Sequence, residues 1–344
     1  MTGRYRKIKV VSRKWTAEDR GQYTADYHST ARRLSFIFFF LLLSSSVSSQ
    51  ESSTSYNFLR LPVSAHVAAV GGDNITLTDD DPALIFHNPA LINGVSDKSI
   101  NLNFMTYMEG AKTASAAFMK GAGDRGTWGV SAQYMDYGSM KQITPEGEEI
   151  GTFSARDIAV GGTFAYALTN KLSGGATAKF ITSYIAGYNA LAVAVDLGLN
   201  YFDEDHDLSL SAVARNLGGQ IKAYDDRFER IPLDLQVGGT KRIGQSPFRL
   251  SATLSRLNDW SEGFGHHIAV GADILLGRNI YIAAGYNFRR ADQMKINDSD
   301  GASSHGAGFS AGAGLQLERF KLHVAYGKYH VSTASILINL SYAL

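Results

Sequence analysis

The chain has 344 residues, a formal net charge of +1 and 19% charged residues. This balance excludes an extended basic surface for nucleic acid and an acidic disordered tail. Cysteine is absent, which excludes disulfides, thiolate metal sites and cysteine nucleophiles, whereas 35 glycines, 17 tyrosines and 18 phenylalanines favour a chain rich in strands.

The first 49 residues have the pattern of a signal peptide. A polar, basic segment that ends in Arg32-Arg33 precedes the apolar run Leu34–Leu43, and small residues then lead up to Gln50. The run is too short to span a membrane as a helix, which needs about 18 or more apolar residues. Arg32-Arg33 resembles a twin-arginine pair, but the very apolar run favours the general secretory route. It also favours an export signal over a short buried helix.

Residues 50–97 show no regular alternation of apolar and polar side chains. Asp81 before Pro82 is a good start for a helical turn, and Asn88-Pro89 is expected to end that turn almost at once. We predict short helical turns folded into one end of a barrel lumen as a plug, with a periplasmic tail outside the barrel as the alternative. The acidic run Asp79–Asp81 could bind calcium, but a solvated acidic turn is the favoured interpretation.

Residues 98–344 repeat one pattern fourteen times, in which about ten residues alternate in polarity and then reach a turn. Between Tyr188 and Tyr201, for example, large apolar residues alternate with small or polar ones. A soluble sandwich would have many charges on its second face, whereas here that face is small and polar, as suits a lumen. The sequence therefore predicts an all-β protein, a 14-stranded antiparallel transmembrane β-barrel with a short N-terminal plug.

The connections between the predicted strands differ at the two ends of the barrel. Those after even-numbered strands are tight, whereas the long ones, 137–154, 217–232, 258–265 and 290–306, follow odd-numbered strands. Outer-membrane barrels have short turns on the periplasmic side and long loops outside the cell. We therefore expect an integral barrel in the outer membrane of a Gram-negative bacterium, with both ends of the barrel chain on the periplasmic side, next to the N-terminal segment.

Motifs that could carry chemistry occur in strand contexts. Gly121–Gly126 matches a dinucleotide fingerprint but joins two strands, and Gly308–Gly312 matches a hydrolase elbow but is followed only by strands. His266 and His267 are expected on opposite faces of a strand, so they cannot bind one metal ion together. We expect no enzyme activity, no cofactor and no metal site. Inward-facing charges could form a selective constriction, but an internal ion-pair network is favoured; they are Asp196, Arg215, Asp234, Arg249, Asp273, Arg289 and Lys321.

A plug that carries Asn88-Pro89-Ala90 before fourteen strands is similar to that of the long-chain fatty-acid transporter barrels. A closer resemblance is to the PorV/PorQ family of type IX secretion barrels of Bacteroidetes, in Tyr56–Pro62, His87–Leu91 and Arg215–Gly218. This resemblance implies a non-enzymatic component of the attachment complex in the outer membrane. Its implied partners are a PorZ-like surface protein, PorU, PorV and outer-membrane lipid, without nucleic acid.

Two functions follow from these patterns. The first is an anchor for a surface-attachment complex, and the alternative is a fatty-acid-transporter-like channel for hydrophobic small molecules. Small, polar inward positions favour the anchor, whereas an apolar pocket built by plug residues Leu84–Phe86, Leu91 and Ile92 would favour the channel. The loop residues expected to bind a partner are Glu146, Glu148, Glu149, Asp225, Asp226, Arg227, Arg230, Arg290 and Asp292.

Overall fold

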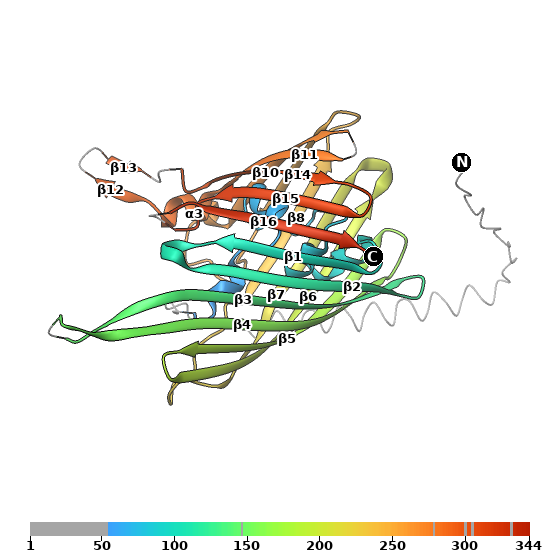
Figure 1. The fold of residues 1–344 in the computed structure, drawn as a ribbon. Helices are drawn as coiled ribbons and strands as arrows, with labels where there is room; N and C mark the ends of the chain where they lie inside the picture. Colours follow the sequence, from blue (N-terminus) through green and yellow to red (C-terminus); the bar gives the residue numbers. More distant parts are fainter. Residues whose placement is uncertain (1–53, 146, 278, 299–300, 304–305, 331–332) are drawn as a thin grey trace, which may run out of the picture. The chain divides into compact units, whose positions relative to one another are not determined.

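The computed structural model of the protein describes residues 54–145, 147–277, 279–298, 301–303, 306–330 and 333–344 (Figure 1). The signal peptide expected for residues 1–49 lies outside the described residues. In the described part of the chain, no helix is long and apolar enough to cross a membrane.

Fourteen strands close into one antiparallel barrel, which confirms the predicted fold class. Each strand pairs with its neighbour in the chain, apart from the insertion between β11 and β14, and the sheet closes where Ser99 of β1 lies opposite Ala343 of β16. The barrel strands are β1 (Ser99–Thr106), β2 (Lys112–Ala122), β3 (Gly126–Ile143), β4 (Glu149–Ala167), β5 (Leu172–Ile185), β6 (Tyr188–Asp203), β7 (Leu208–Lys222), β8 (Asp234–Arg242), β9 (Phe248–Leu254), β10 (Ile268–Leu276), β11 (Ile280–Asn287), β14 (Phe309–Gln316), β15 (Phe320–Gly327) and β16 (Ser335–Ala343).

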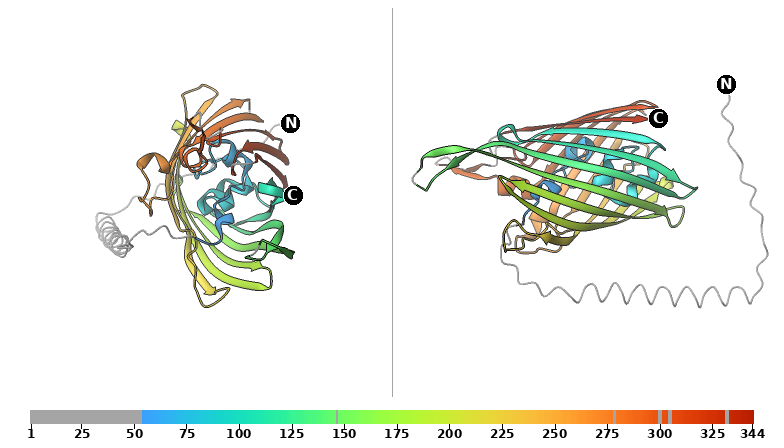
Figure 2. Two further views of the ribbon diagram at one scale, coloured as in Figure 1. Left: turned by 90° about the vertical axis from the view of Figure 1, so that its left-hand side faces the viewer. Right: turned by 60° about the horizontal axis from the view of Figure 1, so that its bottom comes forward.

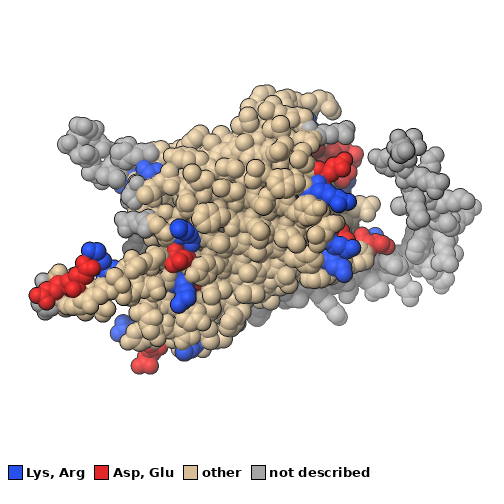
Figure 3. Space-filling view, in the orientation of Figure 1, with Lys and Arg blue, Asp and Glu red and all other residues tan. Residues whose placement is uncertain are grey.

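Side chains alternate between the lumen and the outer surface, as the sequence pattern predicts. On β6, Ala192 is fully buried inside the barrel, whereas the neighbouring Val193 is 43% exposed on the outside. The outward positions of the strands are largely apolar, and the face shown in Figure 3 has charged side chains near its two ends but none across its middle. A closed sheet pairs its own backbone groups, so this apolar band can lie in lipid. The protein is therefore an integral barrel of the outer-membrane type.

The two ends of the barrel differ as predicted. At the turn end, β2–β3, β4–β5, β6–β7, β8–β9, β10–β11 and β14–β15 are joined by short connections, and at the loop end the connections 223–233, 255–267 and 288–308 are long. One expected loop is largely strand, and another begins later than expected. Most of 137–154 is a protruding hairpin of β3 and β4 (Figure 1), and β7 continues to Lys222 before its loop begins. The 288–308 connection contains α3 (Phe288–Gln293) and the small hairpin of β12 (Ile296–Asp298) and β13 (Gly301–Ser303).

Residues 54–98 lie inside the barrel and are called the plug below (Figure 2). At the loop end, Thr54 bridges to Arg230 in the β7–β8 connection. At the turn end, the Asp97 carboxylate accepts a hydrogen bond of 2.7 Å from the Gly121 N–H. The plug thus passes through the lumen from one end to the other. The expectation that the N-terminal segment lies beside the periplasmic ends of the barrel chain is therefore wrong for its first described residues, which are at the opposite end.

Candidate functional site

Four short helical turns form the plug: η1 (Asn57–Arg60), α2 (Ala65–Ala69), η2 (Pro82–Phe86) and η3 (Pro89–Gly94). The Asp81 side chain caps η2 by accepting from the Ala83 N–H at 2.9 Å, with Pro82 in the first position, as predicted. Asn88 does more than end this turn. It also caps η3, because its Oδ1 accepts from the Ala90 N–H at 3.0 Å.

The Asn88-Pro89-Ala90 element rests directly on the barrel wall. Asn88 is fully buried, and its Nδ2 donates to the Ile75 carbonyl at 3.0 Å and to Ser211 Oγ at 3.2 Å. The wall opposite it consists of two glycines. A Cβ atom on Gly198 would lie 2.1 Å from Asn88 Oδ1, and one on Gly175 would lie 2.5 Å from the Pro89 carbonyl carbon. No larger residue fits at either position without moving the plug.

A second contact of the same kind holds the other side of the plug. Val70 and Gly71, at the end of α2, lie against Gly271 of β10 and Gly285 of β11. A Cβ atom at Gly271 would be 2.4 Å from Val70 Cβ, and one at Gly285 would be 2.3 Å from the Gly71 nitrogen. The small inward residues of the strands are therefore matched to the plug backbone.

Charged side chains bridge the plug to the wall at its centre. His66 of α2 lies 2.6 Å from Asp273 and 3.0 Å from Asp79, and Arg249 of β9 pairs with both carboxylates, at 3.0 and 2.8 Å. Burial opposes a charge on the imidazole, but the carboxylates of Asp273 and Asp79 outweigh it and raise the pKa of His66 to about 9. Two cations and two anions therefore compensate each other in a buried network.

The acidic run Asp79–Asp81 is not a solvated turn, so the favoured prediction for it is wrong. Asp79 belongs to the central network, Asp80 pairs with Lys321 of β15 at 2.5 Å, and Asp81 accepts from Ser64 Oγ at 2.7 Å. Among the described residues no group of acidic and histidine side chains is arranged to hold a metal ion. Five of the seven inward charges form ion pairs with described residues, in line with the favoured interpretation, whereas Arg215 and Asp234 form none with them. Arg289, for example, pairs with Glu262 at 3.1 Å.

His87 has the opposite electrostatic role to His66. Its Nε2 accepts from the backbone N–H groups of Val63 and Ser64, at 3.3 and 3.2 Å, so this nitrogen carries no proton. Burial lowers the pKa of His87 well below its usual value, and the nearby charges of Arg215 and Lys179 lower it further. His87 is thus a neutral acceptor that joins η2 to the segment before α2.

The wall next to the plug is irregular at the Arg215–Gly218 element. The β6–β7 register shifts between Val195 and Leu197, and Asn216 has a left-handed backbone conformation with a φ of 58°. The Asn216 N–H donates to Asp196 at 2.7 Å, and Lys179 pairs with the same carboxylate at 2.5 Å. The bulge turns Arg215 toward the plug, where its Nη2 donates to the Leu59 carbonyl at 2.9 Å.

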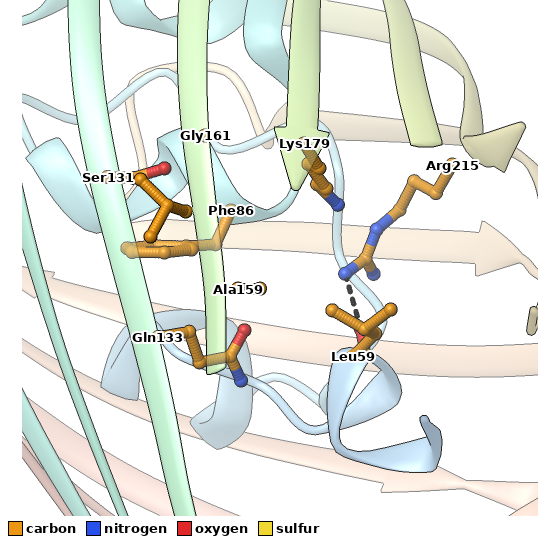
Figure 4. Close-up of a pocket in the computed structure, with 9 residues that line it drawn as sticks. Leu59, Phe86, Ser131, Gln133, Ala159, Gly161, Lys179 and Arg215 are labelled. Carbon is orange, nitrogen blue, oxygen red and sulfur yellow. Dashed lines mark hydrogen bonds between the residues drawn. The ribbon is translucent and has the colours of Figure 1, made fainter. Parts of the chain in front are cut away.

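A small pocket lies between this wall and the plug (Figure 4). Leu59 and Phe86 of the plug face Gln133, Ala159 and the cationic side chains of Lys179 and Arg215 across it. Its free volume is about 20 Å³. That is room for roughly one or two water molecules, but not for a hydrocarbon chain. The other apolar plug residues are packed away from solvent: Leu84, Ile85, Leu91 and Ile92 are each at most 4% exposed.

The loop residues expected to bind a partner have different environments. Glu148 and Glu149 lie exposed at the tip of the β3–β4 hairpin, and Asp225, Asp226, Arg227 and Arg230 are exposed in the β7–β8 connection, whereas Glu146 lies outside the described residues. Arg290 contradicts the expectation because it is only 7% exposed. It donates to the Ala307 and Gly308 carbonyls, so it fastens its own loop. Asp292 is half-buried and pairs with His266 at 2.9 Å.

The remaining motifs have structural roles. Ala122 to Gly126 is a tight turn between β2 and β3, as predicted. Ser310 lies fully buried on β14 and donates to the Ala69 carbonyl of the plug at 3.0 Å. His266 and His267 lie in η6 (Phe264–His267) rather than in a strand, and they have different partners, since His267 bonds the Ser255 carbonyl.

The fold is similar to those of solved channel and transporter structures. The Pseudomonas putida toluene transporter TodX has a TM-score of 0.54 at 15% identity, covering 82% of this chain and 98% of that one. The CymD monoaromatic hydrocarbon channel has a TM-score of 0.51 at 13% identity, covering 82% of this chain and 97% of that one. A Pseudomonas aeruginosa FadL homologue has a TM-score of 0.51 at 12% identity, covering 83% of this chain and 99% of that one. No family model and no curated protein matches the sequence. The likeness is one of fold, and the resemblance to the PorV/PorQ family stays a prediction.

Proposed function

We propose that this barrel, which has the fatty-acid-transporter-like fold, is an outer-membrane channel for small hydrophobic molecules with the plug as its closing element. The proposal is supported by the solved structures of the same fold, which are described as a toluene transporter and a monoaromatic hydrocarbon channel. The observation in this chain that carries it is the apolar face of Leu59 and Phe86 beside the wall pocket.

The pocket is too small for a hydrocarbon chain in this structure, so passage requires the plug to shift. Phe86 lies in η2, which packs on η3 and the first strands, whereas the central ion-pair network anchors α2. A movement confined to η1 and η2 would enlarge the pocket without breaking that network. The plug would then open along the β3–β5 wall and stay attached along β9–β11.

Uptake measurements with a matched pair of variants test the channel. Ala159→Phe fills the pocket from β4, whereas Val160→Phe places the same ring on the outer face, where Val160 is 51% exposed. We expect Ala159→Phe to lower toluene uptake by cells several-fold and Val160→Phe to leave it unchanged. Equal uptake by both variants, or by cells without the barrel, would contradict a channel through this pocket.

The second candidate is an anchor for a surface-attachment complex of type IX secretion, as PorQ within the PorV/PorQ family is understood to be. The observation that favours it is the β3–β4 hairpin. Beyond Asp136 of β3 and Ser154 of β4, the described strand residues of the hairpin pair only with each other, and their exposed side chains include Ile143 and Ile150. Such a ribbon offers free edges and apolar surface to a partner. The proposed partners are a PorZ-like surface protein, PorU and PorV.

Shortening the hairpin separates the two candidates. Replacing residues 140–153 by a two-residue Asn-Gly turn leaves every barrel strand pair intact. If the protein is an anchor, this variant releases its surface partner into the medium while toluene uptake stays as in the wild type. If it is a channel, surface retention stays unchanged and only the Ala159→Phe variant has a phenotype.

A further inference from the structure

A carboxylate at the loop end of the lumen is buried and has no cationic partner among the described residues. Asp157, on the inward face of β4, is 5% exposed. It accepts hydrogen bonds from Tyr137 Oη, at 2.6 Å, and from Ser183 Oγ. Among the ion pairs formed by the described residues, none includes Asp157. A carboxylate offers about four acceptor sites, so about two of them remain free.

Two other inward carboxylates of the strands have cationic partners. Asp196 pairs with Lys179 at 2.5 Å, and Asp273 pairs with His66 and Arg249. Asp234 has no ion pair with any described residue, but it lies in the electrostatic field of Arg215 and accepts from the Arg256 N–H. Burying a charge without an opposite charge is unfavourable. The environment of Asp157 therefore lacks the cationic side chain that this barrel places beside Asp196 and Asp273.

Tyrosines from separate segments lie at this end of the lumen, and two of them connect to the carboxylate by hydrogen bonds. Tyr137 belongs to the β3 end, Tyr224 to the β7–β8 connection and Tyr107 to the β1–β2 connection, and all three are half-buried against the same apolar cluster. Tyr224 Oη donates to Ser183, which in turn donates to Asp157. Tyrosine rings attract cations through their faces, most strongly where water is excluded. A carboxylate beneath half-exposed tyrosines is complementary to an ammonium group on an alkyl chain.

We infer that Asp157, together with Tyr137 and Tyr224, binds an alkylammonium group that arrives from the loop end. The ammonium group pairs with the free acceptor positions of Asp157, and the methylene groups lie against the two rings. The ligand is either a small amine or a lysine side chain presented by a surface protein. This inference does not depend on the proposed channel, because the site lies at the mouth and not at the plug pocket.

Calorimetric titration of the purified full-length barrel in micelles tests the site. The probes are hexylammonium, hexanoate and hexanol, which share one alkyl chain and differ in charge. Asp157→Asn removes the carboxylate charge, and the control Asp136→Asn removes a carboxylate on β3 near the same height. We expect hexylammonium alone to bind, with an affinity at least about tenfold weaker in Asp157→Asn and unchanged in Asp136→Asn.

Tyr137→Leu gives a second test, in case Asp157→Asn does not fold. It removes a ring and should weaken hexylammonium binding, whereas Tyr137→Phe keeps the ring, frees one more acceptor position and should bind at least as well as the wild type. A peptide with one internal lysine distinguishes the sources, since tighter binding than hexylammonium indicates a protein ligand and weaker binding a small amine. No hexylammonium binding by the wild type would overturn the inference. Binding as tight as that of the wild type by both the Asp157→Asn and Tyr137→Leu variants would also overturn it.

Discussion

Replacing Gly198 by alanine should displace the plug from the barrel wall. The added Cβ would lie 2.1 Å from Asn88 Oδ1 and 2.9 Å from Pro89 Cδ. Since non-bonded carbon contacts are normally about 3.5–4.0 Å, Asn88 must move by about 1 Å or more. That movement strains the hydrogen bonds from Asn88 to Ile75 and Ser211. Their loss, together with the overpacking, gives an expected destabilisation of about 2–4 kcal/mol.

The control for this prediction is Gly162→Ala. Gly162 lies on β4 with nothing within 4 Å of the position of an added Cβ, so alanine there should be neutral or slightly stabilising. Both variants can be refolded into lipid vesicles, unfolded with urea and then compared for ion conductance in planar bilayers. We expect Gly198→Ala alone to lose stability and gain conductance. If Gly198→Ala matched the wild type in both measurements, the plug would not rest on β6 as described.

The remaining predictions address the outer face, the network at the centre of the lumen and the direction of the plug. Val193→Arg places a charge on the lipid side and should destabilise the folded barrel in lipid by about 2–4 kcal/mol, whereas Val193→Leu should have little effect. The pKa of His66 is raised to about 9 in the folded protein; its ion pairs should therefore stabilise the plug fully below about pH 6.5, the ordinary histidine value, and progressively less as the pH rises through 9. Unfolding between pH 6 and 10 should show this loss in the wild type and not in His66→Gln. Because the chain has no native cysteine, single-cysteine variants can report the plug direction: an impermeant maleimide should label Thr54→Cys on intact cells and Asp124→Cys only after the outer membrane is opened.

The sequence predicts the barrel well because strand alternation is a local property. A β-strand reverses its side chains at every residue, so Ala192 and Val193 are assigned to opposite faces without knowledge of any partner. The pattern of short and long connections predicts the two ends in the same way. Strand length is less well predicted, since β3 and β4 continue past the membrane as a free hairpin in which turn residues such as Gly138 are tolerated.

The plug contacts could not be predicted because they join residues far apart in the chain. Asp79 and Arg249 are 170 positions apart, and no local pattern identifies them as partners. An acidic run followed by proline is equally compatible with a solvated turn, so the sequence alone favours the wrong environment for Asp79–Asp81. The inward glycines of the strands do indicate where the plug backbone contacts the wall. Gly175, Gly198, Gly271 and Gly285 all occupy inward positions of well-formed strands, where a close approach by another backbone is the usual reason for glycine.

The passage of the plug through the whole lumen constrains the order of barrel assembly. The sheet closes between its first and last strands, β1 and β16, and Asn339 of β16 also bonds the Val63 carbonyl of the plug at 2.9 Å. A 45-residue segment (54–98) that entered after that pair had formed would have to thread through the closed barrel. Folding of the plug against the wall before β1 and β16 pair avoids this threading. In an intermediate in which β1 and β16 are still unpaired, the plug would offer β16 a surface to bind before the barrel closes.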